Sequence, residues 1–321
     1  MQRREFITLL GGAAVVLPRA AAAQQHFATG LLNTGASTFF IGPFMGKLEE
    51  LGYHEGKNLV VDRKFANGST ERLNEFAAEL VRKHVDVIVT IGSPAAFAAK
   101  QATSTTPIVF GAISDPVGLG LVVSLARPGG NATGNSLMAP ELSAKRFEIL
   151  RALAPGISRF AILWDSSNPG MAERVHETKI AADQSHVLLQ IVGPRNLDEL
   201  EAAFAELLSR RPDALLVTTE AFTRQHLDRI LDFANQNKIP AMFEDSSFVE
   251  AGGLMSYGPD YREVFRTAAV LVDKILKGAK PADLPIEQPT KFQLVINQKA
   301  AAALGIEIPP MLLTMASRVI E

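Results

Sequence analysis

The sequence predicts an α/β protein in which two doubly wound, parallel-sheet lobes are joined by three crossover strands. Apolar strand-like runs alternate with helical segments, as at 86–91, 95–101 and 107–113, and this alternation is typical of parallel sheets covered on both faces. The module occurs a second time, because 211–218 echoes 84–90 in residue pattern. A length of 321 residues also suits two lobes better than one small domain.

The first lobe is expected to alternate strands and helices from its first residues. Its predicted strands are 27–32, 58–65, 86–91, 107–113 and 131–137, and its predicted helices are 40–51, one following the turn at 67–69, and 95–101. The helix after that turn has Leu73, Phe76 and Leu80 at helical spacing, so these side chains share one face. The segment 117–126 is expected to be helical or irregular.

The second lobe repeats this order after a connecting helix that ends at Pro155 and Gly156. Its predicted strands are 159–164, 187–192, 213–218 and 239–243, with helices between them. Asn196 and Glu199 have the spacing of a capping box and mark the start of one of these helices. A long helix carrying residues 264–275, a strand at 291–296 and a short helix at 297–304 follow.

Three crossovers set the expected division into lobes, at about 138–141, 255–259 and 284–292. The N-terminal lobe then comprises 26–138 and 256–284, and the C-terminal lobe comprises 139–255 and 285–321. Neither lobe is continuous in sequence, and the cleft is expected between the strand ends of the two lobes.

Residues 1–23 have the features of an export signal peptide. Arg3 and Arg4 precede an apolar run, and the alanines at 20–23 form an A-x-A-like cleavage site. The arginine pair resembles a twin-arginine signal, and an ordinary secretory signal with two arginines is the alternative. The sequence has no cysteine, so it offers neither a disulfide nor a lipid acceptor at the cleavage site. We therefore expect a soluble periplasmic protein that is not lipid-anchored and is monomeric.

Composition and motifs argue against several other functions. The formal charge is −2 and no basic stripe occurs, which argues against nucleic acid as a partner. The six histidines show no metal-ligand pattern, and the sequence has neither a Gly-x-Ser-x-Gly elbow nor a phosphate-binding loop. We expect a protein that is not an enzyme and that uses no cofactor and no metal.

Polar residues gather where predicted strands end, and ligands of parallel sheets bind beyond those carboxyl ends. Gly92 and Ser93 stand at a helix N-terminus, where free N–H groups favour a ligand carboxylate; a simple helix cap is the alternative. Asp115, beside Ser114 in one lobe, and Glu220 in the other are carboxylates that suit a ligand ammonium group. A turn residue and a solvated loop end are their respective alternative roles.

Two aromatic and four polar residues complete the predicted ligand contacts. Trp164, the only tryptophan, ends a predicted strand and suits either stacking on a ligand or completing the core. Tyr257 lies on a predicted crossover close to the cleft, where packing at the hinge is the alternative role. The remaining candidates are chosen by their position at strand ends alone: Asn33, Thr34, Asn168 and Glu244.

The order and spacing of several short motifs resemble one group of ABC-transporter substrate-binding proteins. The matching segments are 92–95, 107–108, 114–117, 127–134, 257–258, 294–297 and 303–306, which together extend over nearly the whole chain. The resemblance implies the type I periplasmic-binding-protein fold, with a hinge that closes on a ligand. It also implies an ABC permease in the inner membrane as partner and a small polar ligand, because characterised relatives bind aromatic or other amino acids.

The leading hypothesis is therefore a periplasmic solute-binding protein of an ABC importer, which captures an amino acid or similar small molecule by hinge closure. An exported sensor that signals to a membrane receptor is the alternative, and an exported enzyme comes third. A Ser-His-Asp set converging in the cleft would favour the enzyme. The sequence does not distinguish transport from sensing.

Overall fold

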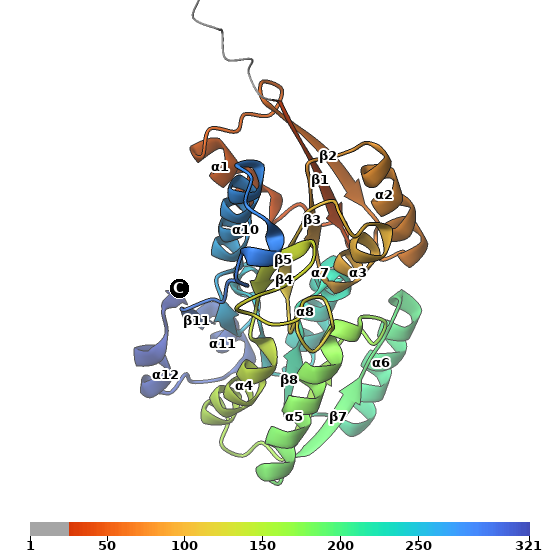
Figure 1. Cartoon of the computed structure of the whole chain (residues 1–321). Helices are drawn as coiled ribbons and strands as arrows, with labels where there is room; N and C mark the ends of the chain where they lie inside the picture. Colours follow the sequence, from red (N-terminus) through yellow and green to blue (C-terminus); the bar gives the residue numbers. More distant parts are fainter. Residues whose placement is uncertain (1–25) are drawn as a thin grey trace, which may run out of the picture.

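The computed structural model of this protein describes residues 26–321 and contains two α/β lobes, one above the other in Figure 1. The predicted export signal at 1–23 lies outside the described residues. Within the described part, no helix is both long and apolar enough to cross a bilayer. The N-lobe (27–136, with 261–287) and the C-lobe (139–259, with 292–320) each contain one sheet.

The N-lobe sheet has five parallel strands in the order β2-β1-β3-β4-β5. Its strands are β1 (Phe27–Asn33), β2 (Leu59–Phe65), β3 (Val87–Ile91), β4 (Ile108–Ile113) and β5 (Ala132–Ser136). Strands β3 and β4 are apolar and almost fully buried because helices cover both faces of the sheet.

Four helices cover this sheet, two on each face. They are α1 (Ile41–Glu50), α2 (Thr70–Arg82), α3 (Ser93–Ala102) and α10 (Tyr261–Leu276). Helices α1 and α10 share one apolar core with alternate residues of the strands, and α2 and α3 share the other. Segment 117–126, expected to be helical or irregular, contains no helix and is held by turns.

The C-lobe sheet has seven strands in the order β12-β11-β10-β9-β8-β6-β7, and only the β10–β11 pair is antiparallel. The strands are β6 (Arg159–Leu163), β7 (Leu188–Val192), β8 (Ala214–Val217), β9 (Ala241–Phe243), β10 (Met255–Pro259), β11 (Phe292–Asn297) and β12 (Arg318–Ile320). The predicted class, α/β with two doubly wound parallel-sheet lobes, is confirmed.

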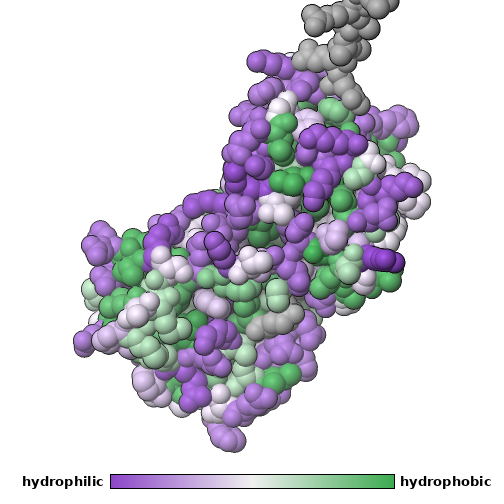
Figure 2. Space-filling view, turned by 60° about the vertical axis from the view of Figure 1, so that its left-hand side comes forward, coloured by the Kyte–Doolittle hydropathy of each residue, from purple (hydrophilic) through white to green (hydrophobic). Residues whose placement is uncertain are grey.

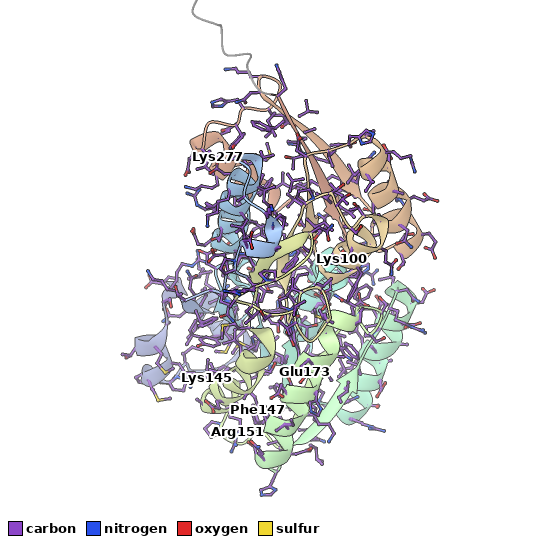
Figure 3. All side chains as sticks on the ribbon, in the orientation of Figure 1. Lys100, Lys145, Phe147, Arg151, Glu173 and Lys277 are labelled. Atoms are coloured by element: carbon purple, nitrogen blue, oxygen red, sulfur yellow. The ribbon has the colours of Figure 1, made fainter. Side chains whose placement is uncertain are left out.

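The C-lobe helices also lie on both faces of their sheet. They are α4 (Ala139–Leu153), α5 (Ala172–Gln184), α6 (Leu197–Arg210), α7 (Ala221–Gln225), α8 (Leu227–Gln236), α9 (Ser246–Glu250), α11 (Gln298–Leu304) and α12 (Pro310–Met315), with short 3-10 turns η1 (Pro169–Met171) and η2 (Pro281–Asp283). Helices α4 and α5 pack on one face, and α6 and α8 on the other. In Figure 3, Phe147 and Arg151 mark α4 in the lower lobe, and Lys277 marks the end of α10 in the upper lobe.

Three segments connect the lobes: 137–138 between β5 and α4, Asp260 between β10 and α10, and 288–291 between the N-lobe segment that ends at Glu287 and β11. The sequence analysis assigns 256–259 to the N-terminal lobe, whereas these residues form β10 and pair with β9 and β11 of the C-lobe. It assigns 285–287 to the C-terminal lobe, whereas Ile286 and Glu287 donate backbone hydrogen bonds to Leu125 and Gly134 of the N-lobe. Figure 2 shows the two lobes on either side of a narrower waist.

Candidate ligand-binding site between the lobes

A cavity lies between the carboxyl ends of the strands of the two lobes and encloses about 60 Å³. This inner cavity is lined by Asn33, Thr34, Gly35, Ser37, Phe40, Ile91, Gly92, Ser93, Pro94, Ala112 and Tyr261 from the N-lobe, and by Asn168, Met171, Thr219, Glu220, Ala221 and Arg224 from the C-lobe. A larger outer chamber of about 630 Å³ adjoins the inner cavity, and the two spaces share Thr34, Pro94 and Ala221 in their walls. Six of the predicted contact residues therefore meet in one place.

On the N-lobe side, Asn33 and Thr34 hold the loop after β1. The Asn33 side chain accepts a hydrogen bond from the Gly35 N–H (3.0 Å) and donates one to the Ser37 carbonyl (2.8 Å). The Thr34 hydroxyl donates to the Ile91 carbonyl (2.9 Å) and accepts from the Ala95 N–H (3.2 Å). Both side chains line the cavity, but these hydrogen bonds also give them a structural role.

The first turn of α3 has fewer free donors than its position predicts. Pro94 has no N–H, and the Ala95 N–H is already bonded to Thr34. Gly92 has a φ of 89°, and a Cβ atom there would lie 2.9 Å from the Thr34 hydroxyl. The Ser93 N–H and hydroxyl are therefore the donors that this turn offers at the cavity.

An apolar wall completes the N-lobe side of the cavity. Phe40 stacks on Tyr261 (ring centroids 5.7 Å apart) and on Phe265 (4.6 Å). Burial raises the pKa of the Tyr261 phenol, which therefore stays neutral. Ala112 lines the same wall with a φ of 59°, where β4 shifts register against β5, so this non-glycine residue is strained next to the cavity.

Glu220 is the acidic residue in the wall of the inner cavity. Its Oε2 accepts a hydrogen bond from the Thr218 hydroxyl (2.8 Å), whereas its buried Oε1 has no hydrogen-bond partner among the described residues. Burial, with a smaller contribution from the nearby Asp165 carboxylate, raises the pKa of Glu220 to about 8. The cavity thus contains a carboxyl group that lacks a cation.

The lobes touch at two glycines beside the cavity. Asn168 accepts a hydrogen bond from the Gly170 N–H (3.1 Å) at the start of η1, and η1 packs against α3. A Cβ atom on Gly170 would lie 2.3 Å from the Ser93 hydroxyl oxygen, and one on Gly35 would lie 3.0 Å from Ala221 Cβ. A side chain at Gly170 would therefore collide with Ser93 unless Ser93 moved.

Arg224 contacts both lobes next to the inner cavity. Its guanidinium carbon lies 4.7 Å from the centre of the Phe40 ring, in the N-lobe, and 5.0 Å from that of Phe248, in the C-lobe. It also forms an ion pair with Asp245 and donates to the Ser247 hydroxyl (2.9 Å). The side chain is thus fixed in the C-lobe and stacked against the N-lobe.

A buried charge cluster contains two further predicted residues, Ser114 and Glu244. Arg146 lies 2.9 Å from Glu244, and Arg174 forms an ion pair with the same carboxylate. Arg174 Nε donates to the hydroxyl of Ser114, in the N-lobe (2.9 Å), and the Thr219 N–H donates to Glu244 (2.8 Å). Neither Ser114 nor Glu244 is among the residues that line the two cavities.

Asp115, Trp164 and Tyr257 lie away from both cavities. Asp115 accepts hydrogen bonds from the N–H groups of Val117 (3.1 Å) and Gly118 (2.9 Å), as expected of a turn residue. Trp164 and Tyr257 pack against the apolar core of the C-lobe. Tyr257 also lies 6.4 Å, centre to centre, from the Phe292 ring.

Sequence reasoning missed Phe40, Ala112, Met171, Arg224 and Tyr261, which all line the inner cavity. Phe40 precedes α1 and Tyr261 begins α10, so neither follows a strand of a repeated module. Separately, Glu173, His176 and Glu177 place potential metal-ligand atoms within 4.8 Å of one another on α5, where Figure 3 labels Glu173. Exposed acidic groups of this kind are common without a metal, and none of the three lines the cavities.

Known proteins resemble this chain over most of its length. The "Tyrosine-binding protein" of Clostridioides difficile strain R20291 is 29% identical over 265 residues, which are 82% of this chain and 76% of that protein. An ABC domain from Streptococcus pneumonia, solved in complex with L-Trp, has a TM-score of 0.86 at 27% identity and covers 92% of this chain and 100% of its own.

A third relative was solved in a ligand-free, open form. This substrate-binding protein with adhesive properties from Clostridium difficile has a TM-score of 0.65 at 26% identity, covering 92% of this chain and 99% of its own. The family model described as ABC transporter substrate binding protein matches residues 39–320. The chain therefore belongs to the ABC transporter substrate-binding protein family.

Proposed function

We propose that this protein is the periplasmic solute-binding component of an ABC importer and that it captures an amino acid between its lobes. The observation that carries this proposal is the Glu220 carboxyl group, whose buried Oε1 has no partner in the inner cavity. A buried ionised carboxylate is costly unless a cation pairs with it. The ammonium group of an amino acid supplies that cation.

The opposite wall suits the rest of such a ligand. The Ser93 N–H and hydroxyl, at the start of α3, are the donors for the ligand carboxylate. Phe40, Tyr261 and Met171 give the inner cavity an apolar, partly aromatic lining. This lining favours an amino acid with an apolar or aromatic side chain, in agreement with the ligands named for the two relatives, tyrosine and L-Trp. Because the inner cavity encloses only about 60 Å³, a ligand of that size also occupies part of the adjoining outer chamber of about 630 Å³.

Two observations support capture by hinge closure. At nearly equal sequence identity, the chain is more similar to the L-Trp complex (TM-score 0.86) than to the ligand-free, open relative (0.65). The contacts of Gly170 with Ser93 and of Arg174 with Ser114 join the lobes, as expected of a closed arrangement. The membrane permease would then recognise the closed, loaded form.

Calorimetry of the mature protein tests this function. At pH 8.5, where Glu220 is largely ionised, we expect binding of L-tyrosine or L-tryptophan, and we expect Glu220→Gln to weaken it by ~2–5 kcal/mol. Glu173→Gln, an equal charge change on the exposed surface of α5, is the matched control. Failure to bind either amino acid, or equal affinities for wild type and Glu220→Gln, would contradict the proposal.

A further inference from the structure

Asp165 and Glu220 follow neighbouring strands of the C-lobe sheet. Strands β6 and β8 are parallel, and Leu163 is in register with Val217. Asp165 therefore comes two residues beyond β6, and Glu220 three residues beyond β8, at the same edge of the sheet. Asp165 lines the outer chamber and Glu220 lines the inner cavity, with Ala221 in the walls of both. The two carboxyl groups thus lie on either side of the boundary between the cavities.

Each of these carboxyl groups has one oxygen held by the protein. Asp165 Oδ1 accepts hydrogen bonds from the Ser167 N–H (2.9 Å) and hydroxyl (2.6 Å), and Glu220 Oε2 accepts one from Thr218. Glu220 Oε1 is buried and has no hydrogen-bond partner among the described residues, and the hydrogen bonds that Asp165 accepts from the Ser167 N–H and hydroxyl both go to its Oδ1. Neither carboxylate forms an ion pair with a described Lys, Arg or His side chain.

Other charged groups around the pair do not neutralise it. Arg174, from α5, is ion-paired with Glu244, from the end of β9, and these two charges act on Glu220 in opposite directions. In the outer chamber, Arg195 is ion-paired with Glu199, and His226 is the other titratable side chain in its wall. Arg224, on α7, is ion-paired with Asp245. The two carboxyl groups at the boundary therefore have no cationic side chain of their own among the described residues.

We propose that Asp165 is the second carboxylate of the ammonium site, so that Asp165 and Glu220 together bind the ligand's ammonium group. In the empty protein the two carboxyl groups share a proton, and this proton is released to solvent when the ammonium group binds. This inference rests on the proposed function, which supplies an amino acid as ligand. An ammonium group has three N–H donors and can therefore bond to a carboxylate oxygen of each residue, whereas one carboxylate uses only part of that capacity.

The proton follows from the electrostatics of the empty site. Burial raises the pKa of Asp165, and burial together with the Asp165 charge raises the pKa of Glu220 to about 8. Below pH 8 the empty pair therefore holds a proton that the loaded pair does not. Binding then releases up to one proton, and the affinity rises with pH towards 8, by at most about tenfold per pH unit.

Calorimetry at pH 6.5 in phosphate and in Tris measures the protons released when L-tyrosine binds. We expect close to one proton for the wild type, and a smaller number for Asp165→Asn because the Glu220 pKa falls when the neighbouring charge is removed. At pH 8.5, Asp165→Asn should bind L-tyrosine and tyramine about tenfold more weakly. It should leave unchanged the affinity for 3-(4-hydroxyphenyl)propionate, which has no ammonium group. Asp183→Asn, an exposed charge removal on α5, is the matched control.

If Asp165 only holds the Ser167 turn, Asp165→Asn should weaken the binding of all three ligands equally and leave the proton release unchanged. That result would overturn the proposal. Binding of L-tyrosine to the wild type without proton release would also overturn it.

If neither L-tyrosine nor L-tryptophan binds, the proposed function fails, but the ligand-free protein still tests whether Asp165 and Glu220 share a proton. Its free energy of unfolding should fall between about pH 4.5 and 8, because the folded state keeps a proton that the unfolded chain loses. Asp165→Asn should shift this decrease in the free energy of unfolding to lower pH. A decrease over the same pH range as in the wild type would contradict the coupling of Asp165 with Glu220.

Discussion

The two lobes have the same architecture but differ in what they bring to the cleft. At the strand ends of the C-lobe, Asp165, Glu220, Glu244 and Asp245 are buried or partly buried carboxylates, and Arg146, Arg174 and Arg224 pair with two of them. At the strand ends of the N-lobe, the buried polar residues are uncharged: Asn33, Thr34, Ser93, Ser114, Asn135 and Ser136. The ion pairs of the N-lobe, such as Lys83 with Asp62, are more exposed and lie away from the cavities.

This difference indicates that one lobe supplies the electrostatics and the other supplies hydrogen-bond donors and an apolar wall. The arginines of the C-lobe come from helices α4, α5 and α7, which reach the strand ends from both faces of the sheet. The charges are thus paired before the lobes meet. An uncharged N-lobe surface would then lose little hydration free energy in the proposed closure on a ligand.

The largest expected effect on stability comes from removing a buried charge in the C-lobe. Arg174→Met removes one partner of Glu244 and the hydrogen bond to Ser114, and we expect it to lower the free energy of unfolding by ~3–5 kcal/mol. Lys83→Met removes exposed N-lobe ion pairs with Asp62 and Glu79 and should lower the free energy of unfolding far less, because solvent screens exposed charges. Urea denaturation measures both, and equal losses would contradict the distinction between the lobes.

A smaller effect is expected where the two lobes touch. Gly170→Ala places a Cβ atom 2.3 Å from the Ser93 hydroxyl oxygen, so the closed form should be disfavoured by ~1–3 kcal/mol. We expect weaker ligand binding and a larger radius of gyration in small-angle scattering with L-tyrosine present. Gly156→Ala, where a Cβ atom meets nothing within 4 Å, is the control. Unchanged compaction in Gly170→Ala would mean that closure does not need this contact.

The smallest effect is expected at Asp115, the N-lobe counterpart of Glu220. Its carboxylate caps a turn, and Asn is about as good a cap as Asp, so Asp115→Asn should change the stability by less than ~0.5 kcal/mol. Ligand affinity should also stay within about twofold of wild type, because Asp115 does not line either cavity. A loss of affinity comparable to that of Glu220→Gln would show that both lobes bind the ammonium group.

Local patterns were sufficient to predict most of the elements and part of the site, although α9, α12 and β12 were missed. Continuous apolar runs specified β3, β4 and β8, since strands buried on both faces need no alternation. The rule that ligands bind beyond parallel strand ends led to Asn33, Ser93, Asn168 and Glu220, and all four line the inner cavity. The same rule also selected Asp115, because sequence position does not reveal which hydrogen bonds a carboxylate makes within its own turn.

The sequence by itself determined the α/β class, the repeated halves and the family resemblance, because these depend on periodicity and motifs that are local in the chain. Only the tertiary structure decided that Tyr261, at the start of α10, stacks on Phe40, 221 positions earlier, and that Arg224 lies between rings of different lobes. It also decided that Arg174 reaches Ser114 across the cleft. These contacts join residues far apart in sequence, within one lobe for Phe40 and Tyr261 and between the two lobes for Arg224 and Arg174, and no local pattern encodes how distant segments meet.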